Sequence, residues 1–274
     1  MDILAMQNWS YIPDLPDDLD PIRNLLLEYS KIASENVNSH MLRVREDAWK
    51  ISRFPSVGRW KFMRLTAQDD PCYQQVLFRL TVPRSNDALL DLGCCVGQVL
   101  RQLRHDGVRG SQLFGTDVRP EFVDIGYDLF QDRDSLGAVF VAGDMLDPDD
   151  HRLDELSRKV TIIYAGSFFH LFNWTQQLYI GKRLVGFLKQ GTKNAFIYGR
   201  HIGTSRPGAS SIGNASPYLH DKDSFQRLWD EVGDLTKTKW AVELEPAGDE
   251  IVDIPRMDRD AQPVTFIIHQ ICCS

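Results

Sequence analysis

Short apolar runs alternate with amphipathic stretches through the middle and the end of the chain. The run at 88–92 predicts a buried strand, and the apolar spacing of Val99, Leu100 and Leu103 predicts a helix directly after it. Strands that alternate with helical patterns in this way are typical of an α/β fold with a parallel sheet. Later segments predict further strands at 113–117, 139–144, 160–167, 195–199, 238–244 and 264–272.

Helical spacing dominates the first 85 residues instead. It predicts helices at 21–33, with Asp20 as the N-cap, at 36–52, and between 63 and 80 with a break near Pro71. None of these segments continues the alternation of strands and helices. We therefore divide the chain into an N-terminal helical region, 1–85, and a core, 86–274.

Two segments of the core each have two possible roles. The glycine- and serine-rich stretch 200–217 follows the fifth predicted strand, and it is either a lid or a tolerated surface loop. The acidic stretch 147–156 leads into a short helix, so we favour complementing the helix dipole over a metal site. Two longer helices are predicted at 174–188, ended by Gly191, and at 221–232, capped by Asp221 or Asp223.

The tightest turn of the core joins the first predicted strand to its helix with the spacing Asp91-x-Gly93-x-Cys95-x-Gly97. A strand, a glycine turn and a helix form a geometry that holds nucleotide-like ligands, and Gly93 lets ligand atoms approach the bare backbone. Asp117 follows about 20 residues later, where such folds place a carboxylate on ribose hydroxyls. The alternative is an ordinary turn that binds nothing. This alternative is disfavoured, because polar or small residues end four successive strands. They are Asp91, Asp117, Asp144 and Ser167.

The spacing resembles the first motif of class I S-adenosylmethionine (SAM) methyltransferases, Asp/Glu-x-Gly-x-Gly-x-Gly, with Cys95 in place of the middle glycine. The segments 91–98, 115–122 and 143–146 also look like those of fungal methyltransferases from meroterpenoid and related secondary-metabolite pathways. The resemblance implies a Rossmann-like, seven-stranded, mostly parallel sheet with helices on both faces and an antiparallel last strand. It further implies an N-terminal helical cap over the ligand cleft, for which plain packing or an oligomer contact is the alternative.

The same resemblance assigns residues to SAM. It places Asp117 and Val118 on the ribose and Asp144 and Met145 on the adenine. Gly93 and Gly97 would form the turn at the methionine end. Three further cofactor-binding positions, at the turn and at strand ends, are Asp91, Cys94 and Ser167. Because Cys95 carries a side chain, we expect a positive backbone angle to be disfavoured there.

The acceptor is expected beside the segment after the fourth strand, where His170 is the one imidazole. A carboxylate acceptor is ionised at neutral pH and needs no base, whereas a phenol with a pKa of about 10 would use His170. The subgroup resemblance favours methyl esterification of a carboxylate on an apolar small molecule. The alternatives are a phenol or hydroxyl acceptor with His170 as the catalytic base, and a histidine that only packs locally. An apolar wall would come from Phe168, Phe169, Phe172 and Trp174.

Several other enzyme classes fit the sequence less well. No Asn/Asp-Pro-Pro-Phe/Tyr motif follows the fourth strand, which argues against amino methylation of DNA bases. Cys72 follows Pro71 ahead of the glycine turn, the wrong order for a cytosine-C5 nucleophile, and no metal-ligand set marks a cation-dependent enzyme. The rivals that remain are a cyclase or lyase on the same fold, a non-catalytic SAM-binding protein and a nicotinamide dehydrogenase, the last disfavoured by the glycine spacing.

Composition limits the environment and the partners. The 274 residues carry a formal net charge of −7 at pH 7, which argues against a nucleic-acid partner. No apolar stretch approaches the about 20 residues that a membrane span needs, and the N-terminus lacks a signal-peptide pattern. Five cysteines without disulfide or zinc spacing predict a reduced, cytoplasmic protein. The resemblance leaves room for a homodimer.

Overall fold

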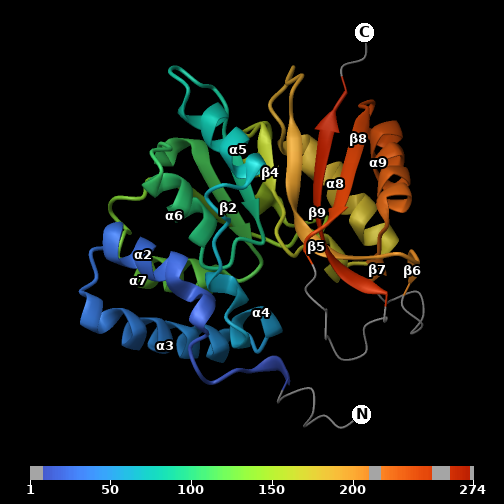
Figure 1. Cartoon of the computed structure of the whole chain (residues 1–274). Helices are drawn as coiled ribbons and strands as arrows, with labels where there is room; N and C mark the ends of the chain where they lie inside the picture. Colours follow the sequence, from blue (N-terminus) through green and yellow to red (C-terminus); the bar gives the residue numbers. More distant parts are fainter. Residues whose placement is uncertain (1–8, 210–216, 249–259, 272–274) are drawn as a thin grey trace. The chain divides into compact units, whose positions relative to one another are not determined.

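The computed structural model of the chain describes residues 9–209, 217–248 and 260–271. Its main sheet has seven strands in the order β3-β2-β1-β4-β5-β9-β8 (Figure 1). Neighbouring strands β2/β3, β1/β4 and β4/β5 are parallel, whereas β9 runs antiparallel to β5 and β8, so the predicted fold class is confirmed. The strands are β1 (Leu89–Leu92), β2 (Leu113–Asp117), β3 (Val139–Ala142), β4 (Ile162–Tyr164), β5 (Phe196–Thr204), β8 (Trp240–Pro246) and β9 (Ala261–Gln270).

The fifth strand is longer than its apolar run predicts. β5 continues to Thr204 because its polar end pairs with the first residues of β9, Thr204 lying opposite Ala261. The prediction of a loop from residue 200 is therefore wrong for its first residues. Two short strands, β6 (Gly208–Ala209) and β7 (Tyr218–Leu219), pair with each other after β5, and the rest of the predicted loop, 210–216, lies outside the described residues.

Contacts divide the chain into two compact units, which are described separately. The first unit comprises the chain up to residue 86 together with 94–142. It contains β2, β3 and the N-terminal helices, together with the helices that follow the first two strands. These helices are α2 (Asp20–Glu28), α3 (Ser34–Ile51), α4 (Pro55–Gly58), α5 (Pro71–Thr81), α6 (Gln98–His105) and α7 (Pro120–Phe130), with 3-10 turns at Asp17–Leu19, Lys61–Met63 and Gly110–Gln112.

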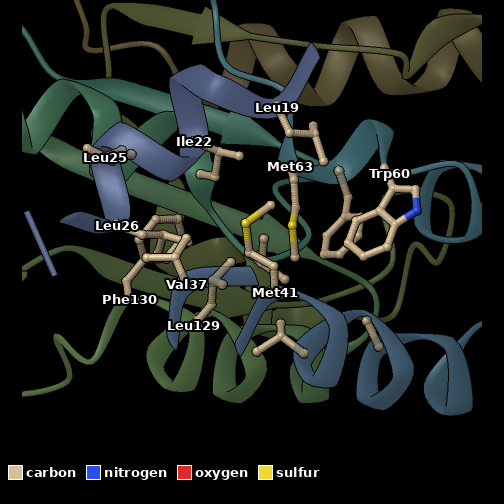
Figure 2. Close-up of a cluster of buried hydrophobic side chains, with 14 of the residues drawn as sticks. Leu19, Ile22, Leu25, Leu26, Val37, Met41, Trp60, Met63, Leu129 and Phe130 are labelled. Carbon is tan, nitrogen blue, oxygen red and sulfur yellow. The ribbon is translucent and has the colours of Figure 1, made fainter. Parts of the chain in front are cut away.

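A hydrophobic cluster joins the N-terminal helices of this unit to α7. Figure 2 shows side chains of α2, α3 and α7 that converge, among them Leu26, Val37 and Phe130, all of which are almost fully buried. The predicted N-cap is wrong, because Asp20 lies inside α2 and Leu19 takes the cap position without a side-chain hydrogen bond. The Asp20 carboxylate instead accepts from Arg23 at 3.0 Å.

The second unit comprises residues 87–93 and the chain from 143 onward. Its helices are α8 (Trp174–Phe187) and α9 (Lys222–Thr236), with 3-10 turns at His151–Leu156 and Phe169–Leu171. Both long helices begin with a capping box, in which Asn173 pairs with Gln176 and Asp221 pairs with Ser224. Of the two predicted caps, Asp221 and Asp223, the structure has Asp221 as the cap and Asp223 in the first turn. α9 extends beyond the predicted end at 232 and stops at Lys237, which has a left-handed backbone.

Candidate cofactor and acceptor site

The glycine turn leaves β1 and enters α6 with positive backbone angles at alternate residues. The φ angles are 69° at Gly93, 49° at Cys95 and 65° at Gly97. The expectation that Cys95 would avoid a positive angle is therefore wrong. A left-handed backbone costs a residue with a side chain about 1–2 kcal/mol. The Cys95 amide helps to offset this cost by donating to Asp117 Oδ2 at 2.9 Å.

Further main-chain hydrogen bonds close the same turn. The Cys94 amide donates to the Thr116 carbonyl at 2.9 Å, and the Gly97 amide donates back to the Cys94 carbonyl at 2.7 Å. The first of these bonds fastens the turn to the end of β2, the strand that also carries Asp117. The turn and the carboxylate are thus held as one piece within the first unit.

Asp117 is half-buried at the end of β2, and backbone amides hold its carboxylate from two sides. Oδ2 accepts from Cys95, and Oδ1 accepts from the Arg119 amide at 3.0 Å. Burial raises the pKa of Asp117, although the backbone amides of Arg119 and Cys95 act in the opposite direction. Each oxygen keeps a further lone pair, so a ribose with adjacent hydroxyl donors fits this acid. The next residue, Val118, is 57% exposed and offers an apolar surface beside it.

In the second unit, Asp144 and Met145 lie on a loop directly after β3. The Asp144 amide donates to Asp150 Oδ2 at 2.8 Å, while the Asp144 carboxylate accepts from the Leu146 amide at 2.8 Å. Arg183 of α8 donates to the carbonyls of both residues, at 3.1 Å for Asp144 and 3.3 Å for Met145. The Asp144 side chain is half-buried and Met145 is buried, so a polar and an apolar group lie side by side on a fixed loop.

The acidic stretch 147–156 serves as local structure around this loop. Asp150 is the N-cap of the 3-10 turn His151–Leu156, since its carboxylate accepts from the Arg152 amide. The preference for a helix-dipole role of the whole stretch over a metal site stays a prediction. The Arg152 guanidinium, aided by the Asp144 amide, holds the pKa of Asp150 well below its usual range. Within the described ranges, no group of three or more His, Cys, Asp or Glu side chains is placed to hold a metal ion.

In the second unit, Asp91 and Gly93 lie at the end of β1, and Gly93 lies against the ring of Phe168. Asp91 is 3% exposed within β1, whereas Gly93 is exposed. A Cβ atom at Gly93 would lie 2.9 Å from the Phe168 ring, so only glycine fits there. Ser167 has a φ of 54° and donates its amide to the Arg200 carbonyl at 2.6 Å. This bond ties the start of the predicted acceptor segment to β5.

His170 lies half-buried on the 3-10 turn that follows. The ring of His201, which is buried on β5, lies 6.5 Å from its ring. Burial, and then the neighbouring His170 and His220, lower the pKa of His201 well below its usual value. His201 therefore stays neutral at pH 7. Of the expected apolar wall, Phe169 is fully buried, whereas the side chains of Phe168, Phe172 and Trp174 are half-buried.

The predicted site residues therefore fall into two sets, one in each unit. Sequence reasoning missed two groups that hold them: Arg183 with Asp150 behind the Asp144 loop, and Arg101 with Asp132 behind the glycine turn. Arg101 lies off the stripe formed by Val99, Leu100 and Leu103, so the helical pattern gave no signal for the second group. The first set is Cys94, Gly97, Asp117 and Val118, and the second is Asp91, Gly93, Asp144, Met145, Ser167 and His170.

Comparison with known proteins identifies clear relatives. Residues 10–63 match a family model described as the meroterpenoid methyltransferase N-terminal domain. The chain is 33% identical to the O-methyltransferase phiE of a fungal species, over 88% of this chain and 83% of that protein. It is 34% identical to the methyltransferase adrK of Penicillium roqueforti, over 85% of this chain and 83% of that protein.

A third relative is named after two compounds. The asnovolin E/chermesin D methyltransferase nvfJ of Aspergillus novofumigatus is 33% identical, over 82% of this chain and 80% of that protein. Among solved structures, a SAM-dependent methyltransferase of Methanosarcina mazei aligns with a TM-score of 0.47 at 11% identity, over 75% of this chain and 99% of that chain. In the part of the chain that is described, no helix is long and apolar enough to cross a membrane.

Proposed function

The chain belongs to the family of fungal O-methyltransferases of secondary metabolism, and from this premise we propose that it uses SAM to methylate an oxygen atom of an apolar small molecule. The observation that carries the SAM proposal is the carboxylate of Asp117, which the Cys95 amide holds against the glycine turn. A carboxylate beside a bare backbone turn suits a ribose whose neighbouring groups must come close.

We assign the chain's own residues the following parts. Asp117 accepts the ribose hydroxyls and Val118 packs beside it, while the Asp144 carboxylate and Met145 face the adenine. Gly93 and Gly97 leave room at the methionine end, and Asp91, Cys94 and Ser167 complete the lining. The bound SAM supplies an electrophilic methyl group on a sulfonium, so the protein mainly has to align the acceptor oxygen with the bond that breaks.

We propose a carboxylate as the acceptor and a methyl ester as the product, in terpenoid or meroterpenoid biosynthesis. An ionised carboxylate is already a nucleophile at neutral pH, so this reaction needs no proton transfer. The half-buried rings of Phe168 and Phe172 offer an apolar surface to the rest of the substrate. The match of residues 10–63 to a meroterpenoid methyltransferase N-terminal domain supports a meroterpenoid as the substrate class.

A second candidate is a phenol or hydroxyl acceptor with His170 as the base. The position of His170 favours it, since this half-buried imidazole lies on a short turn flanked by Phe168 and Phe172. A phenol has a pKa of about 10, so a base near neutral pH would speed its reaction.

Four further points stay predictions. They are the boundary between 85 and 86, the cap role of the N-terminal helices, the homodimer and the cytoplasmic location.

Two measurements test the proposal. Calorimetric titration of the full chain with SAM should give binding that weakens about 100-fold in Asp117→Ala, because charge-assisted hydrogen bonds are lost. Asp124→Ala is the control, since Asp124 is an exposed acid on α7 of the same unit that pairs with Arg133. Incubation with SAM and apolar carboxylic acids should then yield products heavier by one methylene. SAM binding without such products on acids or phenols would favour the non-catalytic or the cyclase and lyase alternatives.

A further inference from the structure

A buried arginine lies directly behind the glycine turn. Arg101 of α6 is fully buried, and its Nη1 donates to the carbonyl of Val96 at 2.9 Å and to that of Gly97 at 3.4 Å. These carbonyls belong to the turn whose amides hold Asp117 and the end of β2. The guanidinium therefore contacts the turn on the side of its carbonyl groups.

The other edge of the same guanidinium is fixed by a carboxylate. Arg101 Nε donates to Asp132 Oδ2 at 2.9 Å, and Nη2 donates to Asp132 Oδ1 at 3.0 Å. Asp132 is only 3% exposed, so both charges of this pair are removed from water. A buried pair of this kind is retained only with well-aligned hydrogen bonds, and the planar fork of an arginine provides them.

Aromatic rings enclose the pair and leave it little room to move. The Arg101 guanidinium carbon lies 5.2 Å from the Tyr127 ring, 5.1 Å from Phe130 and 5.3 Å from Phe140. A Cβ atom at Gly126 would lie 2.3 Å from the Val96 carbonyl oxygen, which shows how closely α7 approaches the turn. The peptide planes of the turn are thus held from several directions within the first unit.

Tyr29 extends this arrangement to the N-terminal region. It lies at the end of α2 and donates its hydroxyl to Asp132 Oδ2 at 2.9 Å. Burial first, and then the charge of Asp132, raise the pKa of Tyr29 far above its usual value, so the hydroxyl keeps its proton. Tyr29 also falls within residues 10–63, which match the meroterpenoid methyltransferase N-terminal domain.

We propose that Arg101, Asp132 and Tyr29 are positioning residues for cofactor binding, through which the N-terminal region sets the geometry of the glycine turn. The path is short: Tyr29 orients Asp132, Asp132 orients Arg101, and Arg101 holds the carbonyls of Val96 and Gly97. The orientation of these peptides in turn fixes the direction of the Cys95 amide that holds Asp117. This inference rests on the proposed function, since it assumes that the turn binds SAM.

The first unit contains a matched control for the arginine. Arg45 of α3 is also buried, donates to two backbone carbonyls, those of Ile12 and Pro13, and lies over the rings of Tyr11 and Trp60. The carbonyls that accept from Arg45 belong to the segment ahead of α2 rather than to the glycine turn. Tyr11 donates to Glu46 at 2.5 Å, so it is the control for Tyr29.

The test compares Arg101→Lys and Tyr29→Phe with Arg45→Lys and Tyr11→Phe in the full chain, by calorimetric titration with SAM and by thermal unfolding. We expect the dissociation constant for SAM to rise about tenfold in Arg101→Lys and about threefold in Tyr29→Phe, since charge-assisted hydrogen bonds are lost. The two controls should lower the unfolding temperature comparably and change the SAM affinity less than about twofold. A merely structural role would instead weaken SAM binding in proportion to the loss of stability in all four variants.

The outcomes distinguish failure of the positioning role from failure of the proposed function. Unchanged SAM affinity in folded Tyr29→Phe and Arg101→Lys, with normal binding by the wild type, overturns the positioning role and leaves the proposed function intact. No SAM binding by the wild type overturns both. If Arg101→Lys does not fold, Tyr29→Phe decides alone, because it removes a single hydroxyl. Its affinity either falls relative to Tyr11→Phe, which supports the proposal, or matches it, which overturns the proposal.

Discussion

The two compact units hold their functional residues by different means. In the first unit, main-chain amides and carbonyls hold the glycine turn and Asp117 in place. In the second unit, the segment with His170 is anchored by the ring of Phe169, which contacts the rings of Phe225 and Phe266. A cofactor common to many enzymes can be recognised by backbone geometry, whereas an individual acceptor requires side chains. Changes at the glycine turn and at Asp117 should therefore act on cofactor binding, and changes at Phe169 and His170 on stability and acceptor chemistry.

The largest effect is expected from removing the anchor of the second unit. Phe169→Ala should lower the free energy of unfolding by about 3–5 kcal/mol, because a fully buried ring leaves a cavity. Urea titration followed by tryptophan fluorescence measures the loss. Phe78→Ala is the control, since this ring is 70% exposed and its removal should cost less than about 0.5 kcal/mol. Equal losses in the two variants would show that Phe169 is not an anchor.

A smaller loss of unfolding free energy is expected from adding a side chain to the glycine turn of the first unit. At Gly97, φ is +65° and a Cβ would lie 2.6 Å from Arg101 Nη1. The guanidinium cannot move away easily, because its Nε and Nη2 are bonded to Asp132. Gly97→Ala should cost about 2–3 kcal/mol and weaken SAM binding, since backbone strain and crowding add. Gly137→Ala is matched in backbone, with φ of +69°, but its nearest neighbour is 3.7 Å away. It should cost about 1 kcal/mol and leave SAM affinity unchanged.

What the sequence could predict depended on how far apart in the chain the interacting residues lie. The glycine turn, the strand ending in Asp117 and the cap at Asp221 depend on residues close together in the chain, and each was predicted correctly as local structure. The positive angle at Cys95 was not predicted, because its compensation comes from a carboxylate 22 residues away.

Longer-range features escaped prediction for the same reason. Tyr29 and Asp132 are separated by 103 residues, so no local pattern announces their hydrogen bond. The extra length of β5 likewise depends on pairing with β9, since its own residues 200–204 have no apolar run. The roles assigned to His170 and to the residues on SAM stay predictions.

An intermediate effect concerns the pH dependence of cofactor binding. The pKa of Asp117 is raised, chiefly by burial, and only the ionised carboxylate accepts from both ribose hydroxyls. SAM affinity should therefore fall as the pH falls through this raised pKa, beginning at a higher pH than for an ordinary aspartate. Asp117→Asn should bind weakly and show no such slope. Calorimetry across the acidic range tests this, and parallel slopes for the two proteins would contradict it.

The smallest effect is expected at His170 if the acceptor is a carboxylate. His170→Gln should then reduce the methylation rate at saturating SAM by less than about threefold, since an ionised carboxylate needs no base. With a phenol as the acceptor, the loss of a base should instead reach about 100-fold or more and remove the acidic limb of the pH–rate profile. His151→Gln is the control, because His151 is 81% exposed and lies on the 3-10 turn after the Asp144 loop. A loss of about 100-fold on an acid substrate, without a change in the acceptor's KM, would mean that His170 takes part in the chemistry of the ester, and the carboxylate mechanism proposed here would have to be abandoned.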